Sequence, residues 1–207
     1  ILNFMFWNEF SFSYPYIGKI GEKNITNGGM MLRLVENADR FNLADLLSTF
    51  NSQMHTSFSP SYIVSCLSPL YIRIDDHNMM KTSLTGINDA IINRTVELVR
   101  EQMNYEGYLP AVKLTDFMWY PEINIPWTPQ LVSSIIFLSK EIKMLYFYPS
   151  YPCIFLSDKY EACNSYQDFL LKVLDVAFDN GYFASKPEMR DWLIERRLII
   201  NELPNFL

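Results

Sequence analysis

Two stretches of this sequence carry residue types that could bind or transform a small molecule. The first is the opening segment 1–10, in which seven of ten residues are large and apolar and Trp7 stands among Asn3 and Asn8. An indole ring can stack on a flat ligand while an amide hydrogen-bonds the edge of that ligand, a combination typical of a pocket. The same pattern equally fits a core helix whose polar groups face outward.

The second stretch is 114–120, where one acid, Asp116, lies within an aromatic run. A carboxylate in apolar surroundings is desolvated, and its pKa can then rise into a range that is useful for proton transfer. The alternative is that Asp116 caps a turn or pairs with Lys113 at the surface. The sequence alone leaves both interpretations open.

Sequence patterns of the common catalytic and metal sites are absent. The pair Gly28-Gly29 is not followed by Lys, so the chain has no phosphate-binding glycine loop, and it has no serine nucleophile elbow. The run 75–77, Asp-Asp-His, is more typical of a solvated loop than of a metal site, and no Cys–His zinc spacing occurs. We therefore expect neither a metal nor a cofactor.

Composition narrows the classes of partner. The chain has 207 residues with a net charge of −6, which argues against extended contact with a nucleic-acid backbone but leaves room for one nucleotide in a local pocket. Aromatic residues make up 15% of the chain and hydrophobic residues 49%. Such a chain has either a large core or an apolar surface that meets a protein partner or a missing N-terminal portion.

Cysteine usage and hydropathy bear on the compartment. Three cysteines at irregular spacing favour free thiols in a reducing environment, so we expect an intracellular, cytoplasmic protein. The most apolar run, 131–139, is far too short to span a membrane and is followed by Lys140 and Glu141, so we expect no membrane contact.

Apolar spacing and capping residues predict mostly helices. The segment 11–27 has the alternation and glycines of a small hairpin or extended connection, 70–74 alternates like a short strand, and 75–85 reads as a polar loop. The predicted helices cover 30–38, 42–50, 60–66, 87–103, 129–145, 165–178 and 185–193. We therefore predict a mainly α fold, a single helical domain over 1–207 with a small β element near the N-terminus, which lacks an N-terminal portion.

The opening motif also resembles that of a known family. Leu2-Asn3-Phe4-Met5-Phe6-Trp7 is similar to the Leu-Asn-Phe-x-Phe-Trp signature of the queuosine salvage family. Members are helical relatives of DNA glycosylases that hydrolyse the N-glycosidic bond of queuosine 5′-phosphate and release queuine for reuse in tRNA. The segments 17–23, 29–33, 128–132 and 187–190 look similar to later family motifs. The family's Asp-Tyr-Arg before Pro-Gln is replaced here by Ile125-Pro126-Trp127, which contains no acid.

The resemblance implies roles for particular residues. Glycosidic cleavage builds positive charge on the ribose. A carboxylate either stabilises this charge or activates the water that attacks the ribose, while other groups hold the departing base. The implied catalytic carboxylate is Asp116, with Glu122 in reserve. The implied substrate-binding residues are Asn3, Phe4, Trp7, Lys19, Arg33, Trp119 and Trp127, with Trp7 stacked on the base, Asn3 at its edge, and Lys19 or Arg33 at the 5′-phosphate.

Two other functions fit the same sequence. One is a non-enzymatic helical subunit that docks a protein partner through exposed aromatic residues. The other is a degenerate glycosylase-like protein that binds a nucleobase without cleaving it, which the missing acid before Pro129-Gln130 favours. A closed pocket containing Trp7 and Asp116 would indicate the enzyme, and a flat apolar face over 1–10 would indicate the interaction subunit.

Overall fold

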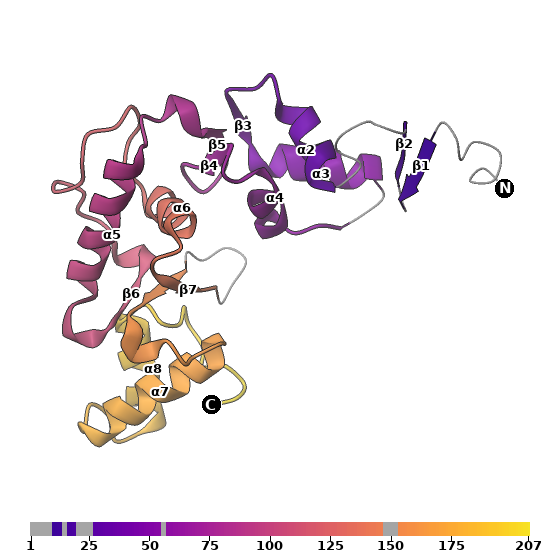
Figure 1. Cartoon of the computed structure of the whole chain (residues 1–207). Coiled ribbons are helices and arrows are strands. Elements are labelled where there is room, and N and C mark those ends of the chain that lie inside the picture. Colours follow the sequence, from indigo (N-terminus) through magenta and orange to yellow (C-terminus); the bar gives the residue numbers. More distant parts are fainter. Residues whose placement is uncertain (1–9, 14–15, 20–26, 55–56, 147–152) are drawn as a thin grey trace. The chain divides into compact units, whose positions relative to one another are not determined.

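The chain forms two compact units in a computed structural model that describes residues 10–13, 16–19, 27–54, 57–146 and 153–207. Unit 1 is Ile1–Gly86 and unit 2 is Ile87–Leu207 (Figure 1). Helices make up about half of the described chain, which agrees with a mainly α protein. The expectation of a single domain over 1–207 stays a prediction.

The described part of unit 1 combines three helices with short antiparallel strands. Its elements are β1 (Phe10–Ser13), β2 (Tyr16–Lys19), α2 (Asn27–Val35), β3 (Arg40–Asn42), α3 (Leu43–Met54), α4 (Pro60–Leu67), β4 (Tyr71–Arg73), β5 (Asn78–Lys81) and a 3-10 turn at Thr82–Leu84. Strands β1 and β2 pair antiparallel, with Phe10 opposite Lys19, which favours the hairpin over the extended connection as the structure of this part of 11–27. The other three strands form a sheet in the order β3-β5-β4.

Local capping explains where two helices of unit 1 begin. The Asn42 side-chain oxygen accepts hydrogen bonds from the backbone N–H groups of Ala44 and Asp45, at 2.9 and 3.2 Å, at the start of α3. Ser59 caps α4, and Pro60 takes the first helical position, where its missing N–H costs nothing. Both starts confirm the sequence prediction. The helices and the sheet enclose a core that includes Met31, Phe50, Ile63, Leu67 and Met79.

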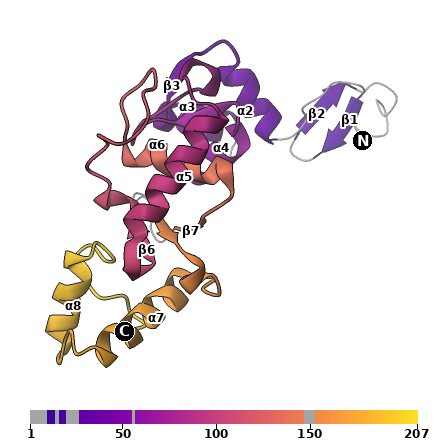
Figure 2. The same ribbon diagram turned by 60° about the vertical axis from the view of Figure 1, so that its left-hand side comes forward.

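Unit 2 places helices on both faces of a small sheet. Its elements are α5 (Asp89–Met103), β6 (Tyr108–Pro110), α6 (Pro129–Ser139), β7 (Lys143–Leu145), β8 (Ile154–Leu156), α7 (Tyr166–Asp179) and α8 (Lys186–Glu195), with 3-10 turns at Asn104–Glu106, Ala111–Lys113 and Asp158–Tyr160. The antiparallel strand order is β6-β8-β7. Figures 1 and 2 show α5 and α6 on one side of this sheet and α7 and α8 on the other.

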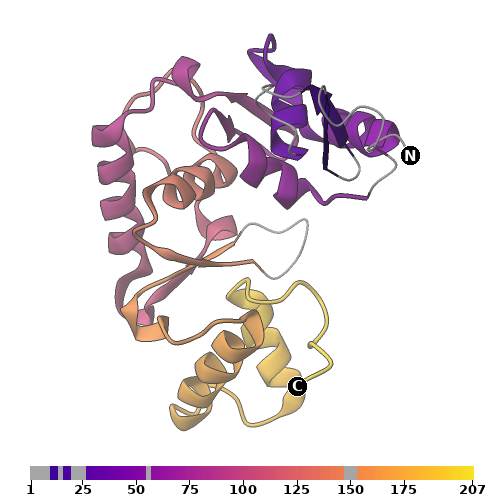
Figure 3. The ribbon, with the colours of Figure 1, turned by 45° about the vertical axis from the view of Figure 1, so that its right-hand side comes forward.

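Alternation along the central strand divides the core of unit 2 into two clusters. Side chains of successive strand residues point to opposite faces. Phe155 accordingly joins a cluster with α5 and α6, whereas Ile154 and Leu156 join a cluster with α7 and α8. All three residues of β8 are buried, so this strand fixes both layers. Figure 3 shows α7 in orange and α8 in yellow in this second layer.

Three sequence expectations of secondary structure need correction. The β structure extends beyond a small N-terminal element, because each unit contains a three-stranded sheet. The expected loop 75–85 contains β5. The helix predicted to reach about Leu145 ends at Ser139, where Lys140 adopts a left-handed conformation with φ of 59° and donates its N–H to the Ile136 carbonyl. Residues 143–145 then pair with β8, a non-local interaction that overrides the helical spacing.

Candidate functional site

The residues predicted to form a site fall in different parts of the chain. Asn3, Phe4 and Trp7 lie outside the described residues. Lys19 is the last residue of β2, and Arg33 lies exposed in the last turn of α2 in unit 1. The remaining four all belong to one continuous segment of unit 2; they are Asp116, Trp119, Glu122 and Trp127.

That segment, residues 114–128, is here named the aromatic loop. It follows the 3-10 turn Ala111–Lys113 and ends at Thr128, whose hydroxyl caps α6 by accepting the Leu131 N–H at 3.0 Å. Leu114 at its start is buried, with 2% of its surface exposed. The Trp127 indole N–H donates to the Pro121 carbonyl at 2.8 Å and closes the second half of the loop. Both ends are therefore tied to the fold.

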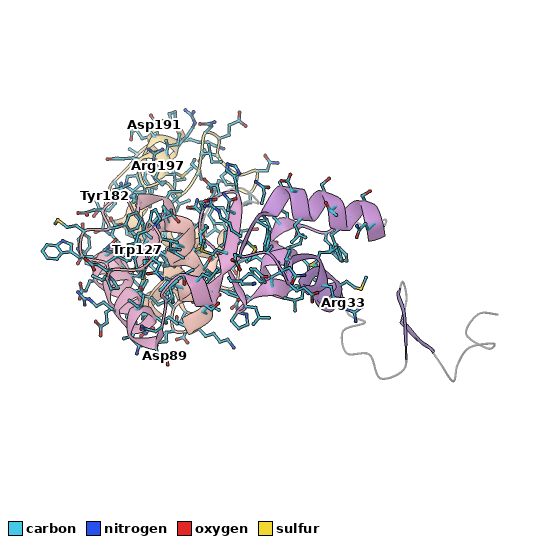
Figure 4. The ribbon with its side chains drawn as sticks, turned by 90° about the horizontal axis from the view of Figure 1, so that it is seen from above. Arg33, Asp89, Trp127, Tyr182, Asp191 and Arg197 are labelled. Atoms are coloured by element: carbon cyan, nitrogen blue, oxygen red, sulfur yellow. The ribbon has the colours of Figure 1, made fainter. Side chains whose placement is uncertain are left out.

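Three rings form the base of the aromatic loop. The ring of Tyr120 contacts that of Phe117 edge-on, with centroids 5.3 Å apart, and that of Trp127 in a tilted arrangement, with centroids 4.9 Å apart. Such pairs contribute about 0.5–1.5 kcal/mol each beyond their buried area. All three rings pack on the cluster formed with α5 and α6, and Figure 4 shows Trp127 among the packed side chains of unit 2.

The two candidate carboxylates are both exposed. The Asp116 carboxylate accepts a hydrogen bond from the Met118 N–H at 3.0 Å, two residues further along, and so caps a turn. This is the alternative that the sequence left open, and the exposed position does not provide the apolar surroundings that desolvation requires. Glu122 is also exposed. Their catalytic roles stay predictions.

The tip of the aromatic loop presents apolar side chains to solvent. Met118 has 72% of its surface exposed and Trp119 has 71%, although the neighbouring Tyr120 is buried at 7%. The resemblance to the queuosine salvage family implied a substrate-binding role for Trp119. The contrast between buried and exposed aromatic residues within four positions depends on the turn at Phe117–Tyr120, where the Tyr120 N–H donates to the Phe117 carbonyl at 3.0 Å.

The Tyr120 hydroxyl is a feature that sequence reasoning missed. It is buried and makes no hydrogen bond of ordinary geometry within the described part of the chain. Burial raises the pKa of Tyr120 to about 12, and the side chain of Gln102 offsets a little of that shift. No signal in the sequence distinguishes this tyrosine from its aromatic neighbours, because its burial depends on α5 and α6 packing over the loop.

Charge and ligand chemistry limit what unit 2 can bind. Residues 87–207 contain 11 Lys and Arg against 16 Asp and Glu, and α6 carries no charged residue between Pro129 and Ser139. Binding to a phosphate backbone needs the opposite balance. Among the residues that the structure describes, no group of three or more His, Cys, Asp or Glu side chains is placed to hold a metal ion.

Comparison with known proteins adds no family to this geometry. No protein-family model, curated protein or solved structure matches the chain. In the described segments, every helix is too short or too polar to cross a membrane.

Proposed function

We propose that this chain is a non-enzymatic interaction module and that the tip of its aromatic loop docks a protein partner. The observation that carries the proposal is the exposure of Met118 and Trp119 directly beside the buried Tyr120. Tryptophan is among the residues that contribute most to binding at protein interfaces. A tip held by a rigid aromatic base loses little conformational entropy when it binds, so more of the contact energy appears as affinity.

The charge of unit 2 supports a protein as the partner. Its acidic excess disfavours an extended nucleic acid, and exposed Trp and Met residues match the composition of the centre of protein interfaces. The exposed carboxylate of Asp116 supports a structural role in the turn that shapes the tip. The free thiols of Cys66, Cys153 and Cys163 support a cytoplasmic location.

A position-specific cross-linking experiment tests this proposal. A photoreactive benzoylphenylalanine replaces Trp119 in the natural host, and the cross-linked proteins are identified by mass spectrometry. Tyr105 supplies the matched control, because it is another aromatic residue of unit 2 and is 82% exposed. We expect a protein that cross-links from position 119 and not from position 105. Identical products from both positions, or none from position 119, would refute the docking surface.

As a second candidate, we propose hydrolysis of queuosine 5′-phosphate to queuine. The motif Leu2-Asn3-Phe4-Met5-Phe6-Trp7 favours this function through its similarity to the queuosine salvage signature. Asp116 would act as the catalytic carboxylate with Glu122 in reserve. Substrate contacts would come from Asn3, Phe4, Trp7, Lys19, Arg33, Trp119 and Trp127.

The second candidate is tested by incubating the purified protein with queuosine 5′-phosphate and measuring free queuine by mass spectrometry. Asp116→Asn is a clean variant, because the amide oxygen can still accept the Met118 N–H while the negative charge is lost. If Asp116 is catalytic, this variant loses turnover with an unchanged melting temperature, and retained turnover refutes the role. A ligand that raises the melting temperature without releasing queuine supports the nucleobase-binding alternative.

A further inference from the structure

A second surface of unit 2, formed by α7, has an independent binding signature. The buried side of α7 contributes Phe169, Leu170, Val173, Leu174 and Ala177 to the core. Its opposite side carries Leu171, Asp175, Phe178 and Asp179, and Tyr182 follows; these five residues are here named the α7 outer face. Leu171 is 40% exposed, Phe178 66% and Tyr182 57%. Spacings of three and four residues put Leu171, Asp175 and Phe178 in one stripe along the helix.

The aromatic end of the α7 outer face is held in place by the fold. Gly181 adopts φ of 68° and ends the helix, and the Tyr182 N–H donates to the Ala177 carbonyl at 3.1 Å. The Tyr182 ring stacks on Trp192 of α8 at 6.1 Å, with the two planes 18° apart. The Arg196 guanidinium contacts both rings of this pair, at 4.1 Å from the Trp192 ring centre and 5.8 Å from the Tyr182 ring centre. Figure 4 shows Tyr182 in the same region as Asp191 of α8.

The acids of the α7 outer face, Asp175 and Asp179, form no ion pair in the part of the chain that the structure describes. Lys172, the one cation of α7, is engaged elsewhere: its ammonium donates to the Lys159 carbonyl at 3.0 Å and lies 5.6 Å from the Tyr160 ring centre. The negative charge beside Leu171 and Phe178 is therefore open to a partner.

The position of these acids on the helix opposes the stability of the fold. Asp179 is the last residue of α7 and Asp175 lies one turn earlier, where the helix dipole is negative and favours Lys, Arg or His. The last turn of α7 contains no basic residue. Asp175 and Asp179 thus weaken their own helix and lie next to exposed apolar side chains. A basic partner that neutralises them would explain why they are present.

We propose that the α7 outer face binds an amphipathic helix with a basic rim, supplied by another protein. An apolar stripe at i, i+4 and i+7 of such a helix would contact Leu171, Phe178 and Tyr182, while flanking Lys or Arg residues would pair with Asp175 and Asp179. The charge complementarity selects this occupant over an acidic or neutral helix, and it selects against an anionic membrane surface. This surface is distinct from the tip of the aromatic loop.

The binding test uses the full chain and a fluorescein-labelled synthetic peptide of about 18 residues, long enough to form a helix on binding. The peptide carries one leucine stripe flanked by lysines, and a peptide of the same composition in scrambled order is the control. Fluorescence anisotropy measures the affinity. We expect the ordered peptide to bind at least about tenfold more tightly than the scrambled one, and more weakly as salt is raised.

Matched variants locate the binding on α7. The double variant Asp175→Asn with Asp179→Asn should weaken the ordered peptide by roughly five- to tenfold and, because it removes an unfavourable dipole interaction, should raise the melting temperature. Glu97→Gln with Glu101→Gln changes the net charge equally on the exposed side of α5, in the other helical layer of unit 2, and should change the affinity by less than about twofold. Phe178→Ala should also weaken binding, whereas Trp119→Ala should not.

Three outcomes would overturn the assignment. Equal loss of affinity in the two double variants would indicate unspecific attraction to net charge. Equal affinity for the ordered and scrambled peptides would remove the helical requirement. Self-association of the chain in sedimentation experiments that disappears in Phe178→Ala would assign the surface to a second copy of the chain instead.

Discussion

At the scale of single residues, two tyrosines of unit 2 differ in one hydrogen bond. The Tyr166 hydroxyl donates to the Leu198 carbonyl and ties the start of α7 to the C-terminal segment. The Tyr120 hydroxyl, under the aromatic loop, is buried without such a bond among the described residues. Burial raises the pKa of both, so both stay neutral at physiological pH.

Removing each hydroxyl should therefore change stability in opposite directions. Tyr120→Phe deletes a buried hydroxyl that makes no hydrogen bond of ordinary geometry among the described residues and should stabilise the protein by about 1 kcal/mol. Tyr166→Phe deletes a hydrogen bond and leaves the Leu198 carbonyl with one donor fewer, so it should destabilise by about 1 kcal/mol. Urea unfolding measures both. A loss of stability in Tyr120→Phe would show that its hydroxyl has a partner in solution.

Residue types predicted some of the candidate site but not its geometry. The run around Asp116 pointed to the aromatic loop, and turn capping by Asp116 was one of two interpretations. Which rings are buried was out of reach, because Tyr120 and Trp119 are adjacent and differ only in how α5 and α6 pack over the loop. The exposed Trp119 thus gives an anchor on the surface where the sequence suggested a pocket.

At the scale of elements, Asp75 holds the turn between β4 and β5. Its carboxylate accepts the backbone N–H groups of His77 and Asn78, at 2.8 and 2.7 Å, and lies 3.3 Å from the Arg40 guanidinium. Burial alone would raise the pKa of Asp75, but these donors and the guanidinium outweigh it and hold the pKa below its usual value. The folded turn therefore binds the charged form more favourably than the unfolded chain does.

This shift predicts a specific dependence on pH. Because the folded pKa is lowered, the contribution of Asp75 is fully present above the unfolded pKa of about 3.9 and is lost as pH falls through the folded value. The unfolding free energy of Asp75→Asn should therefore decrease less than that of wild type as pH falls below about 4. The difference should be at most about 1 kcal/mol, because Asp75 is partly exposed. Asp76→Asn, in the same turn, is the control. If the unfolding free energy of Asp75→Asn depended on pH in the same way as that of wild type and of Asp76→Asn, the assignment would be contradicted.

Helices were predictable from the sequence because their signals are local. Ser59, Ser165 and Ser185 each cap a helix by accepting an N–H three residues later, as their spacing indicated. The hairpin and β4 also had local signals, since alternation marked both. The central strands β5 and β8 did not, because each is three or four residues long and pairs with a strand far earlier in the chain. The stretch 143–145 shows the limit, since its helical spacing gives way to pairing with β8.

At the scale of the whole molecule, unit 2 has a complete core of its own. Among the described residues, both of its clusters are formed by residues between Val96 and Leu207, and the sheet β6-β8-β7 separates them. A segment with its own two-layered core should fold without the rest of the chain. We therefore expect Ile87–Leu207, produced alone, to give a helical circular dichroism spectrum and one cooperative thermal transition. A gradual transition would mean that unit 1 is needed, as in the single domain predicted from the sequence.

The predicted site extended over more of the chain than the structure describes. It combined residues 3–7 with Arg33 in unit 1 and Asp116 in unit 2, so no local pattern could establish their proximity. What the structure adds within unit 2 is a pair of exposed surfaces, the tip of the aromatic loop and the α7 outer face, each beside a rigid aromatic cluster. Both surfaces suit binding to another protein.

The most direct measurement of the central claim is the affinity of Trp119→Ala for the protein that is cross-linked from position 119. Calorimetry with the purified partner compares wild type, Trp119→Ala and the control Tyr105→Ala, which removes an equally accessible ring outside the aromatic loop. We predict that Trp119→Ala weakens binding by about 2 kcal/mol or more, roughly thirtyfold, while Tyr105→Ala matches wild type. Equal affinities for wild type and Trp119→Ala would contradict the account.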